Sequence, residues 1–528
     1  MKLYYLSRLL LYIILLSLVF GCSTKEPALL PFEIRDISVS DKMKIAISRS
    51  YINKMGLPDS TFKYLHDYYS KRDYLPRWIN DSTITKEGFL IKKTLSKPLL
   101  LSIPLGRKYL NKTDNHIQDE INLTLALAQI ISDLKYGFVD YKNKIKKNKK
   151  IIPYHKLDSL IQFNFNLDLR PQFLKYGPND STYRIIGAGL IKLLDSNSLD
   201  TSTFNVKSIK YDTIQTLNQT KKALISKGYF SELDNDSSIF LESLIKFQKD
   251  NNLKPDGVIG KYTCMALNES TLRKVERILL AMDKIRDREN RPDKYIHINI
   301  PEYKLRYYVD GKIKSEHKII VGKIETQTPE LESKLRKIVF YPFWNVPYSI
   351  SSKEILPNIK RDSSYLKTHN YELFKNKNEV SADSVDWTKI YENTFPFKVR
   401  QKPGFTNSLG IVKFDFYNKY SVYFHDTPSK YLFNTYVRSY SHGCMRTENP
   451  IELAKEILSN DKRGWRYNTY IDSLDSILKR GLNHEIKLLS PIPVFVEYQT
   501  VSRIKNNIAN YIDIYSRDDE YIKIMNEL

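Results

Sequence analysis

Apolar residues recur at helical spacing through most of the first 290 positions of the chain. The clearest case is a predicted helix over 119–135, with Gly137 directly behind it as a C-terminal stop. Its apolar residues fall at i, i+4, i+7 and i+11, on one face: Leu123, Leu127, Ile130 and Leu134. Such a face packs into a core and carries no chemistry. The pattern predicts an α-helical scaffold over residues 41–205.

Residues 206–270 change to three short predicted helices. The first ends at Gly228, the second contains Phe240, Leu244 and Phe247, and the third begins near Thr263. The segment resembles a peptidoglycan-binding domain of the three-helix type in Phe247-Gln248, Asp256-Gly257, Ile259-Gly260, Thr263 and Ala266-Leu267. Ligand binding and a helical subdomain that kept the fold without the ligand both stay open. A linking helix is predicted within 271–292.

From residue 293 the apolar period shortens to two, which is typical of strands. Asp310-Gly311 is a strong hairpin signal. Strands are predicted at 295–300, 305–309, 313 onward, 318–321, 337–341, 411–416, 422–425 and 493–498. Helices are predicted at 450–458, with Asn449 as the cap, and at 470–479. The fold class is therefore multidomain α+β, with a helical scaffold and a three-helix module before a mostly β domain at 293–520.

A polar, charged insertion occupies residues 350–396 of this β domain. Long insertions beside an active site often act as lids. A lid-like capping insertion and a solvated surface excursion are both compatible with its composition.

The N-terminus predicts export. Residues 1–21 combine Lys2 and Arg8 with an apolar run of twelve residues, which is too short to span a bilayer and suits a signal peptide. The run ends in Gly21-Cys22, which resembles a bacterial lipobox. We therefore expect lipidation at Cys22, a tether over 22–40, and a membrane-anchored lipoprotein in the cell envelope, facing the periplasm.

The net charge of the chain limits the classes of binding partner that we expect. The net charge is +23, and without residues 1–21, which carry only Lys2 and Arg8, it is +21. The cations are spread along the chain without a dense block or a nucleic-acid-binding motif, so no nucleic acid is expected. Anionic envelope polymers or membrane surfaces fit an exported basic protein better. With Cys22 lipidated, two lone cysteines remain, Cys264 and Cys444, and they do not form a disulfide framework.

One stretch carries candidate chemistry: Ser439-Tyr-Ser-His442-Gly443-Cys444-Met-Arg446, with His425 nineteen residues upstream. A thiolate is a far better nucleophile than a thiol, and we expect a nearby imidazole to lower the pKa of Cys444. Gly443 permits a tight turn that would aim backbone N–H groups at an oxyanion. A buried structural cysteine beside two surface histidines is the alternative.

These residues resemble the active site of the L,D-transpeptidase (YkuD-type) catalytic domain. The resemblance extends to Val321-Gly-Lys323, Thr328-Pro329, Phe343-Trp-Asn-Val-Pro347, Arg400-Gln-Lys-Pro-Gly404, Leu409-Gly410 and Val422-Tyr-Phe-His-Asp-Thr-Pro428. Together with the scaffold and the module, the order of parts resembles the large YcbB-like branch. Members of that branch often carry Ser-Ser-Gly-Cys, whereas this chain has Ser441-His442-Gly443-Cys444, which leaves the role of His442 open.

The resemblance implies a mechanism. Cys444 attacks the third-residue carbonyl of a peptidoglycan stem peptide, the terminal D-amino acid leaves, and the amine of a second stem resolves the thioester into a 3-3 cross-link. His425 would be the general base, the amides near Gly443 and Cys444 the oxyanion donors, His442 a tuning group and Arg446 a contact for a carboxylate or for the loop. Substrate contacts are expected from Trp344, Tyr423 and Ser441.

The same resemblance implies no cofactor. Its expected partners are donor and acceptor stems, a membrane through the lipid, and wall-synthesis proteins. Hydrolysis of the thioester would instead make the protein an L,D-carboxypeptidase, and the same site could attach or release wall-linked proteins. A non-catalytic peptidoglycan-binding lipoprotein is a further alternative. A zinc site built from His425, His442 and Cys444 is weaker, because no supporting carboxylate pattern accompanies them.

Overall fold

The computed structural model describes residues 37–54, 59–80, 83–96, 115–147, 151–196, 202–208, 213–233, 236–288, 291–461 and 467–526. The predicted signal peptide and Cys22 lie outside these ranges. The chain divides into a smaller unit of residues 1–92, 111–125 and 153–160 and a larger unit containing the rest. Within the described ranges, no helix is both long and apolar enough to cross a membrane.

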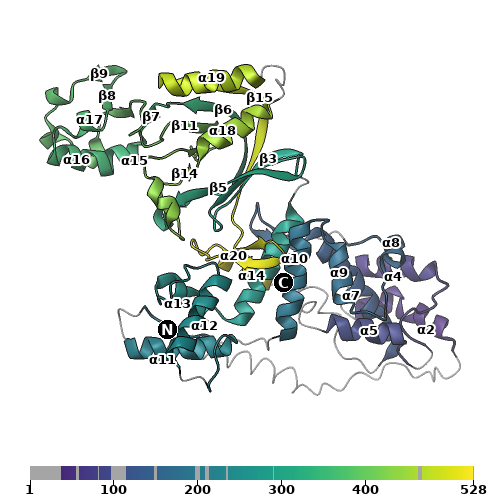
Figure 1. The fold of residues 1–528 in the computed structure, drawn as a ribbon. Helices are drawn as coiled ribbons and strands as arrows, with labels where there is room; N and C mark the ends of the chain where they lie inside the picture. The colour runs from purple at the N-terminus through teal and green to yellow at the C-terminus, as the bar shows by residue number, and fades with distance from the viewer. Residues whose placement is uncertain are drawn as a thin grey trace. The chain divides into compact units, whose positions relative to one another are not determined.

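The smaller unit is helical, as the sequence predicts (Figure 1). Its elements are α2 (Val39–Ala46), α3 (Arg49–Lys54), α4 (Asp59–Ser70), most of α5 (Lys86–Leu95), the first half of α7 (His116–Tyr136) and α8 (Tyr154–Leu160). A fully buried carboxyl, Glu120, holds its core: it accepts from the Tyr69 hydroxyl at 2.6 Å and from the Trp78 N–H at 2.6 Å. Because buried polar groups need such partners, this network explains why a glutamate is tolerated there.

The larger unit begins with the second half of α7. This helix and its stop confirm the prediction for 119–135, since Gly137 has φ +73° in the left-handed region. A Cβ there would meet the Asp283 carboxylate at 2.8 Å, so the site also lacks room for a side chain. The next elements are β1 (Val139–Asp140), β2 (Ile145–Lys146), α9 (Arg170–Phe173), η3 (Leu174–Tyr176) and α10 (Ser181–Ser196).

Three helices then form the predicted module, followed by the linking helix: α11 (Thr213–Ser226), α12 (Ser237–Asp250), α13 (Lys261–Asn268) and α14 (Thr271–Asp287). The matched residue Gln248 has a structural task. Its fully buried amide accepts from the Gly257 N–H at 2.8 Å and donates to the Val258 carbonyl at 3.0 Å. Gln248 therefore fastens the loop before α13, and its presence in the motif is explained without a ligand.

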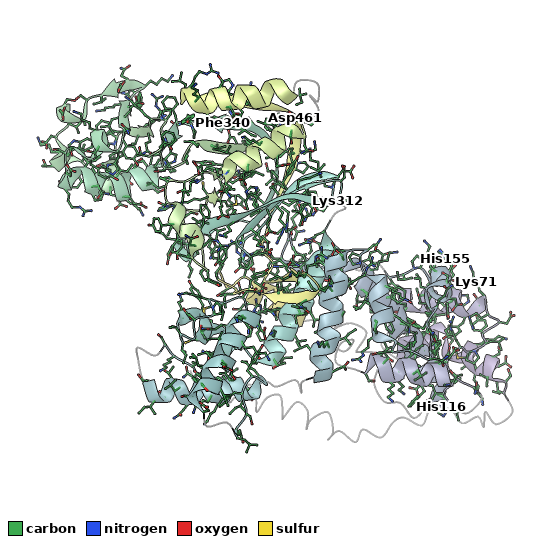
Figure 2. The ribbon with its side chains drawn as sticks, in the orientation of Figure 1. Lys71, His116, His155, Lys312, Phe340 and Asp461 are labelled. Carbon is green, nitrogen blue, oxygen red and sulfur yellow. The ribbon has the colours of Figure 1, made fainter. Side chains whose placement is uncertain are left out.

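The β domain is built on one nine-stranded sheet, in the order β13-β5-β14-β12-β11-β6-β15-β3-β4. β4 also pairs with β5, so the sheet closes on itself. The strands are β3 (Lys294–Asn299), β4 (Lys304–Val309), β5 (Lys312–Gly322), β6 (Leu331–Phe340), β11 (Val412–Phe416), β12 (Phe424–His425), β13 (Ser439–Ser441), β14 (Met445–Thr447) and β15 (His484–Glu497). Alternate side chains fill the interior; Phe340, labelled in Figure 2, is fully buried there.

Helices α18 (Pro450–Ser459) and α19 (Tyr467–Arg480) occur where they are predicted. Asn449 precedes α18 at φ 48° and its side chain makes no capping hydrogen bond. The last predicted strand, 493–498, is the second half of β15, which pairs with β6 on both sides of a register shift between Lys487 and Ile492. Because proline cannot donate the backbone hydrogen bond that strand pairing uses, Pro491 and Pro493 make this strand hard to predict from the sequence pattern.

The C-terminal residues add elements that the apolar pattern did not predict: β16 (Val501–Ile504), β17 (Asn507–Asn510) and α20 (Asp518–Asn526). They join the module to the β domain. Asn252 of the module donates to the Asn510 carbonyl at 2.8 Å, and Ile512 packs against the cores of both parts.

The insertion is a packed subdomain rather than a solvated excursion. It contains α15 (Tyr348–Ile350), a π-helical turn η5 (Ser351–Ile355), α16 (Leu356–Arg361), α17 (Tyr365–Thr368), β8 (Tyr371–Lys375) and β9 (Asn378–Val380). Its strands join the flanking β7 (Trp344–Asn345) and β10 (Lys398–Gln401) in a sheet ordered β7-β10-β8-β9 (Figure 1). A separate core of buried side chains, including Ile355, Leu373 and Val399, holds it together.

Candidate active site

The candidate residues converge because two short strands pair in parallel. In β12 and β14, Phe424 lies opposite Met445 and His425 opposite Arg446. Phe424 and Met445 are fully buried in the core of the sheet. Since successive side chains of a strand point to opposite faces, the residues next to them share the other face: Tyr423, His425, Cys444 and Arg446.

A residue absent from the sequence-based predictions joins this face. β11 runs antiparallel to β12 and places Lys413 opposite His425. Lys413, His425 and Arg446 therefore form one row across three adjacent strands, beside Tyr423 and Cys444. The alternation of the 411–416 strand was visible in the sequence, but its neighbour was not, so Lys413 gave no signal of its own.

Burial raises the pKa of the Cys444 thiol above its ordinary value. Several neighbours act in the opposite direction: the main chain and hydroxyl of Tyr423 hydrogen-bond to the sulfur, and the charges of Lys413 and Arg446 favour the thiolate. The expectation that an imidazole lowers this pKa is wrong in this structure, because desolvation dominates and the opposing groups are a phenol and two cations. Cys444 rests as a thiol inside surroundings that stabilise its anion.

His425 is held as a neutral imidazole. It is 5% exposed, and its Nδ1–H donates to the carbonyl of Asp426. Burial first, and then the charge of Arg446, lower its pKa to about 3, although backbone carbonyls of Asp426 and Leu409 favour the protonated ring. With the proton on Nδ1, the neutral ring has its lone pair on Nε2, which is the form that a general base requires.

The loop that carries Cys444 is fixed from within. Ser441 is 2% exposed; its hydroxyl donates to the Cys444 carbonyl at 2.5 Å and accepts from the Gly443 N–H at 3.2 Å. Gly443 has φ +110°, which favours glycine, and its carbonyl accepts from the Thr328 hydroxyl at 2.9 Å. Ser441 thus shapes the loop, although it was expected to contact substrate. The Gly443 N–H is used inside the loop, so the Cys444 N–H is the member of the expected pair that remains for an oxyanion.

Gly322 explains why the Val321-Gly322-Lys323 motif accompanies this loop. A Cβ at Gly322 would lie 2.0 Å from the Thr326 carbonyl oxygen, so no other residue fits. The close approach lets the Lys323 N–H donate to the Ser441 carbonyl at 2.9 Å and the Ser439 hydroxyl donate to the Gly322 carbonyl at 2.6 Å. The end of β5 therefore supports the cysteine loop from behind.

The aromatic residues lie where the insertion meets the site. Trp344 is half-buried on β7, and its side chain hydrogen-bonds to Tyr423. Burial raises the pKa of Tyr423, and the nearby Cys444 raises it further, so the phenol remains a donor toward the sulfur. Lys413 lies over the Tyr423 ring at 4.1 Å. Arg446 is half-buried beside Cys444, and desolvation lowers its pKa.

His442 points away from the cysteine row toward the insertion. Its Nε2 lies 2.5 Å from the Glu354 carboxylate of η5, and both side chains are partly exposed. Glu354 was not predicted from the sequence, because it lies 88 positions away inside a polar segment. The contact ties the insertion to the cysteine loop.

Among the residues that the structure describes, no group of histidine, cysteine, aspartate and glutamate could hold a metal ion. Two of the three side chains of the zinc alternative have other partners: His442 faces Glu354, and His425 donates to a backbone carbonyl. The geometry of this face suits acyl transfer to a thiol.

Comparison with known proteins agrees with the site. The sequence model of a protein family, YkuD: L,D-transpeptidase catalytic domain, matches residues 293–464. Residues 293–464 form an L,D-transpeptidase catalytic domain of the YkuD type. The match covers β3 through α18 and includes His425, Cys444 and Arg446, as the resemblance implied.

A curated relative, a putative L,D-transpeptidase of Haemophilus influenzae, is 39% identical over 227 residues. These residues are 42% of this chain and 44% of the relative, so the chain matches less than half of the relative's length. Solved L,D-transpeptidases from Xylanimonas cellulosilytica and Stackebrandtia nassauensis are 13% and 12% identical, with TM-scores of 0.18 and 0.19. They cover 52% and 57% of this chain, and 90% and 97% of their own, and values this low bear no weight beside the sequence match.

Proposed function

We propose that this protein is a peptidoglycan L,D-transpeptidase that forms 3-3 cross-links with Cys444 as the nucleophile. The observation that carries the proposal is the row of Lys413, His425 and Arg446 across β11, β12 and β14, with Cys444 and Tyr423 directly beside it. One buried thiol is thereby surrounded by two cations, a phenol and a neutral imidazole. Such surroundings stabilise a thiolate while it forms.

In the first step the Cys444 sulfur bonds to the third-residue carbonyl carbon of a donor stem. The thiol proton passes to Nε2 of His425, and the carbonyl oxygen becomes an oxyanion opposite the Cys444 N–H. The peptide bond then breaks, and the terminal D-amino acid leaves as an amine with the proton from His425. A thioester remains on Cys444.

In the second step the side-chain amine of an acceptor stem attacks the thioester. His425 takes a proton from this amine, and the thiolate of Cys444 leaves and is reprotonated. Burial lowers the pKa of His425 to about 3, so the ring accepts the thiol proton less readily than an ordinary histidine does and returns it readily to each leaving group. The same residues would also accept water, which would make the products those of an L,D-carboxypeptidase.

We further propose that the insertion, residues 350–396, caps the bound stems. It reaches the catalytic face where Glu354 meets His442, and Trp344 on the flanking β7, in the same sheet, hydrogen-bonds to Tyr423. His442 would then hold the cap against the cysteine loop instead of tuning the thiolate directly.

The surrounding parts support a wall enzyme of the YcbB-like branch. We propose a lipid anchor at Cys22 after a signal peptide of 1–21, a tether over 22–40, a scaffold over 41–205, a peptidoglycan-binding-like module over 206–270, and the catalytic domain over 293–520. These assignments place the site in the periplasm, anchored to a membrane and facing the wall.

Mass spectrometry of products from defined disaccharide tetrapeptides tests the proposal. The full-length protein should release the terminal D-amino acid and produce dimers joined between third residues. Tripeptide monomers alone would instead show that the protein is an L,D-carboxypeptidase. Transfer to a protein amine would show that it attaches wall-linked proteins. If no product forms, the protein is a non-catalytic peptidoglycan-binding lipoprotein. Loss of turnover after addition of a chelator would instead support a zinc site at His425, His442 and Cys444.

A further inference from the structure

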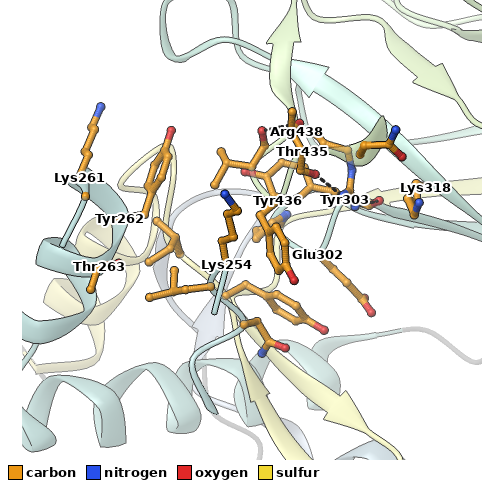
Figure 3. A pocket seen from close by; sticks show the side chains of 18 of the residues that line it. Lys254, Lys261, Tyr262, Thr263, Glu302, Tyr303, Lys318, Thr435, Tyr436 and Arg438 are labelled. Carbon is orange, nitrogen blue, oxygen red and sulfur yellow. Dashed lines mark hydrogen bonds between the residues drawn. The ribbon is translucent and has the colours of Figure 1, made fainter. Parts of the chain in front are cut away.

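A groove of about 750 Å³ lies between the module and the β domain (Figure 3). Its volume falls in the range of about 300–1,000 Å³ that is usual for ligand sites. The module contributes the loop before α13 and the start of that helix, including Lys254, Lys261 and Tyr262. The β domain contributes Tyr303 and the segment 433–438.

Aromatic side chains from both parts dominate the groove: Tyr262, Tyr303, Phe433, Tyr436, Tyr440 and Tyr511. Tyr440 is the middle residue of β13, four positions before Cys444. The groove therefore reaches the strand that leads into the cysteine loop. A ligand lying in it would run from the module to the segment that positions the nucleophile.

The hydroxyl of Tyr303 is the observation that points to a ligand. Tyr303 is 6% exposed, and its hydroxyl makes no hydrogen bond to any residue that the structure describes. Burial raises the pKa of Tyr303, and the nearby hydroxyls of Tyr262 and Tyr440 in the groove and of Tyr515 in the core raise it further. The Tyr303 side chain lines the groove, and its buried, unsatisfied hydroxyl costs free energy that a hydrogen-bond partner brought by a ligand would recover.

The groove also has a positive rim. Lys254, Lys261, Lys304, Lys318 and Arg438 line it against the carboxylates of Asp256 and Glu302. Arg438 is committed to the fold, since it donates to the carbonyls of Ile319 and Thr435 and lies 5.2 Å from the centroid of the Tyr303 ring. Three of the lysines have carboxylate partners within the chain: Lys254 pairs with Asp256, Lys304 with Glu316 and Lys318 with Glu448. Lys261 is exposed at the rim and would attract a chain that bears carboxylates.

We propose that this groove binds the glycan strand of peptidoglycan and thereby presents its stems to Cys444. The inference rests on the proposed function for its biological setting. Pyranose rings combine apolar C–H faces with hydroxyl and amide groups, so they suit flat tyrosine faces with phenolic hydroxyls. The stems attached to such a strand carry the carboxylates that Lys261 would attract.

Binding is measured with the full-length Cys444→Ala protein, so that no turnover disturbs it, against peptide-free glycan strands. Tyr303→Phe removes only the unsatisfied hydroxyl. The variant should melt at the same temperature or higher, since it removes a buried unpaired group, yet bind glycan about fivefold more weakly. Unchanged affinity in Tyr303→Phe would contradict the proposal, because a purely structural tyrosine would behave in that way.

A matched pair tests the aromatic faces. Tyr436 and Tyr420 are equally exposed, at 49% and 48%, but only Tyr436 lines the groove. Tyr436→Ala should weaken glycan binding about tenfold, whereas Tyr420→Ala should leave it unchanged. Equal effects would overturn the proposal.

Two further outcomes separate this proposal from the proposed function. If isolated tetrapeptide stems bind in a Tyr303-dependent manner and peptide-free glycan does not, the groove is a peptide site and the glycan assignment fails. If wild-type protein releases the D-amino acid from tetrapeptides but glycan binding is absent, the groove assignment fails while the transpeptidase proposal stands. If glycan binds without any turnover, the reverse holds.

Discussion

The two described cysteines differ in the groups that surround the sulfur, and Cys264 is buried whereas Cys444 is half-buried. Burial raises the pKa of both Cys264 in the module and Cys444 in the catalytic domain. Against this, Cys264 has only its own backbone hydrogen bond, whereas Cys444 has Tyr423, Lys413 and Arg446. Desolvation alone makes a cysteine inert. Where desolvation is combined with groups that favour the anion, the cysteine rests as a thiol, and its thiolate is stabilised when it forms during the reaction.

The secondary structure explains this difference. Cys264 lies on α13, and its side chain joins an apolar core with Phe247, Leu267 and other residues of the three helices. Cys444 precedes β14; β12 beside it and β11 beyond β12 place His425 and Lys413 on the same face of the sheet. A sheet face gathers residues from several strands at regular spacing. The site is therefore assembled by strand pairing.

The largest expected effect separates the two cysteines directly. Cys444→Ala should reduce release of the D-amino acid more than about 10³-fold, because the nucleophile is lost. Cys264→Ala should retain turnover and lose only about 1 kcal/mol of stability as a small core truncation. Turnover assays and thermal melts measure these effects. Comparable losses of turnover in both variants would refute the assignment of Cys444.

The next largest effect on turnover is expected from replacing the general base, His425. His425→Asn keeps a polar group of similar reach but cannot accept the thiol proton, so turnover should fall about 10²–10⁴-fold. Thermal melting of the same preparation controls for folding, since His425 is buried. If a folded His425→Asn protein keeps full turnover, another group accepts the proton.

Replacing Lys413, the cationic neighbour of Cys444, should have a smaller effect, and this effect should depend on pH. Lys413→Met removes a positive charge that favours the Cys444 thiolate, so the pKa of this thiol should rise further. Its alkylation by iodoacetamide should then require higher pH, with the rate at neutral pH about tenfold lower. Lys312, labelled in Figure 2, is an exposed lysine on the same domain, and Lys312→Met is the control.

Both proteins are labelled across a pH series, and the modified cysteine is identified by mass spectrometry. The Lys312→Met profile should match the wild type. A Lys413→Met profile that also matches the wild type would show that Lys413 does not act on the thiolate.

The smallest effect is expected at the cap. The pair of Glu354 and His442 is partly exposed, and such pairs contribute about 0.2–1 kcal/mol. Glu354→Gln should therefore raise KM for tetrapeptide two- to fivefold with little change in kcat, because the cap closes less firmly over bound stems. Glu379→Gln, an exposed change on β9 of the same insertion, should leave both constants unaltered. A fall in kcat alone would instead place His442 in the chemistry.

Local sequence patterns predict most of the helices and strands and the residue types of the proposed reaction. Helical spacing gave α7 and the three module helices, and alternation gave most strands of the catalytic domain, because these periods depend only on which face is buried. The Ser-His-Gly-Cys-x-Arg string with an upstream histidine predicts the nucleophile and its base, and both lie within the residues 293–464 that match the family.

The contacts among those residues depend on how the strands pair and pack. Parallel pairing of β12 with β14 brings His425 beside Arg446, and antiparallel pairing with β11 brings in Lys413, which no motif marked. Glu354 reaches His442 only because the insertion folds on a core of its own. A pKa depends on the charges and the burial around a group, so the reversal at Cys444 required the packed sheet. Strand neighbours are chosen by long-range packing, and no local pattern contains that choice.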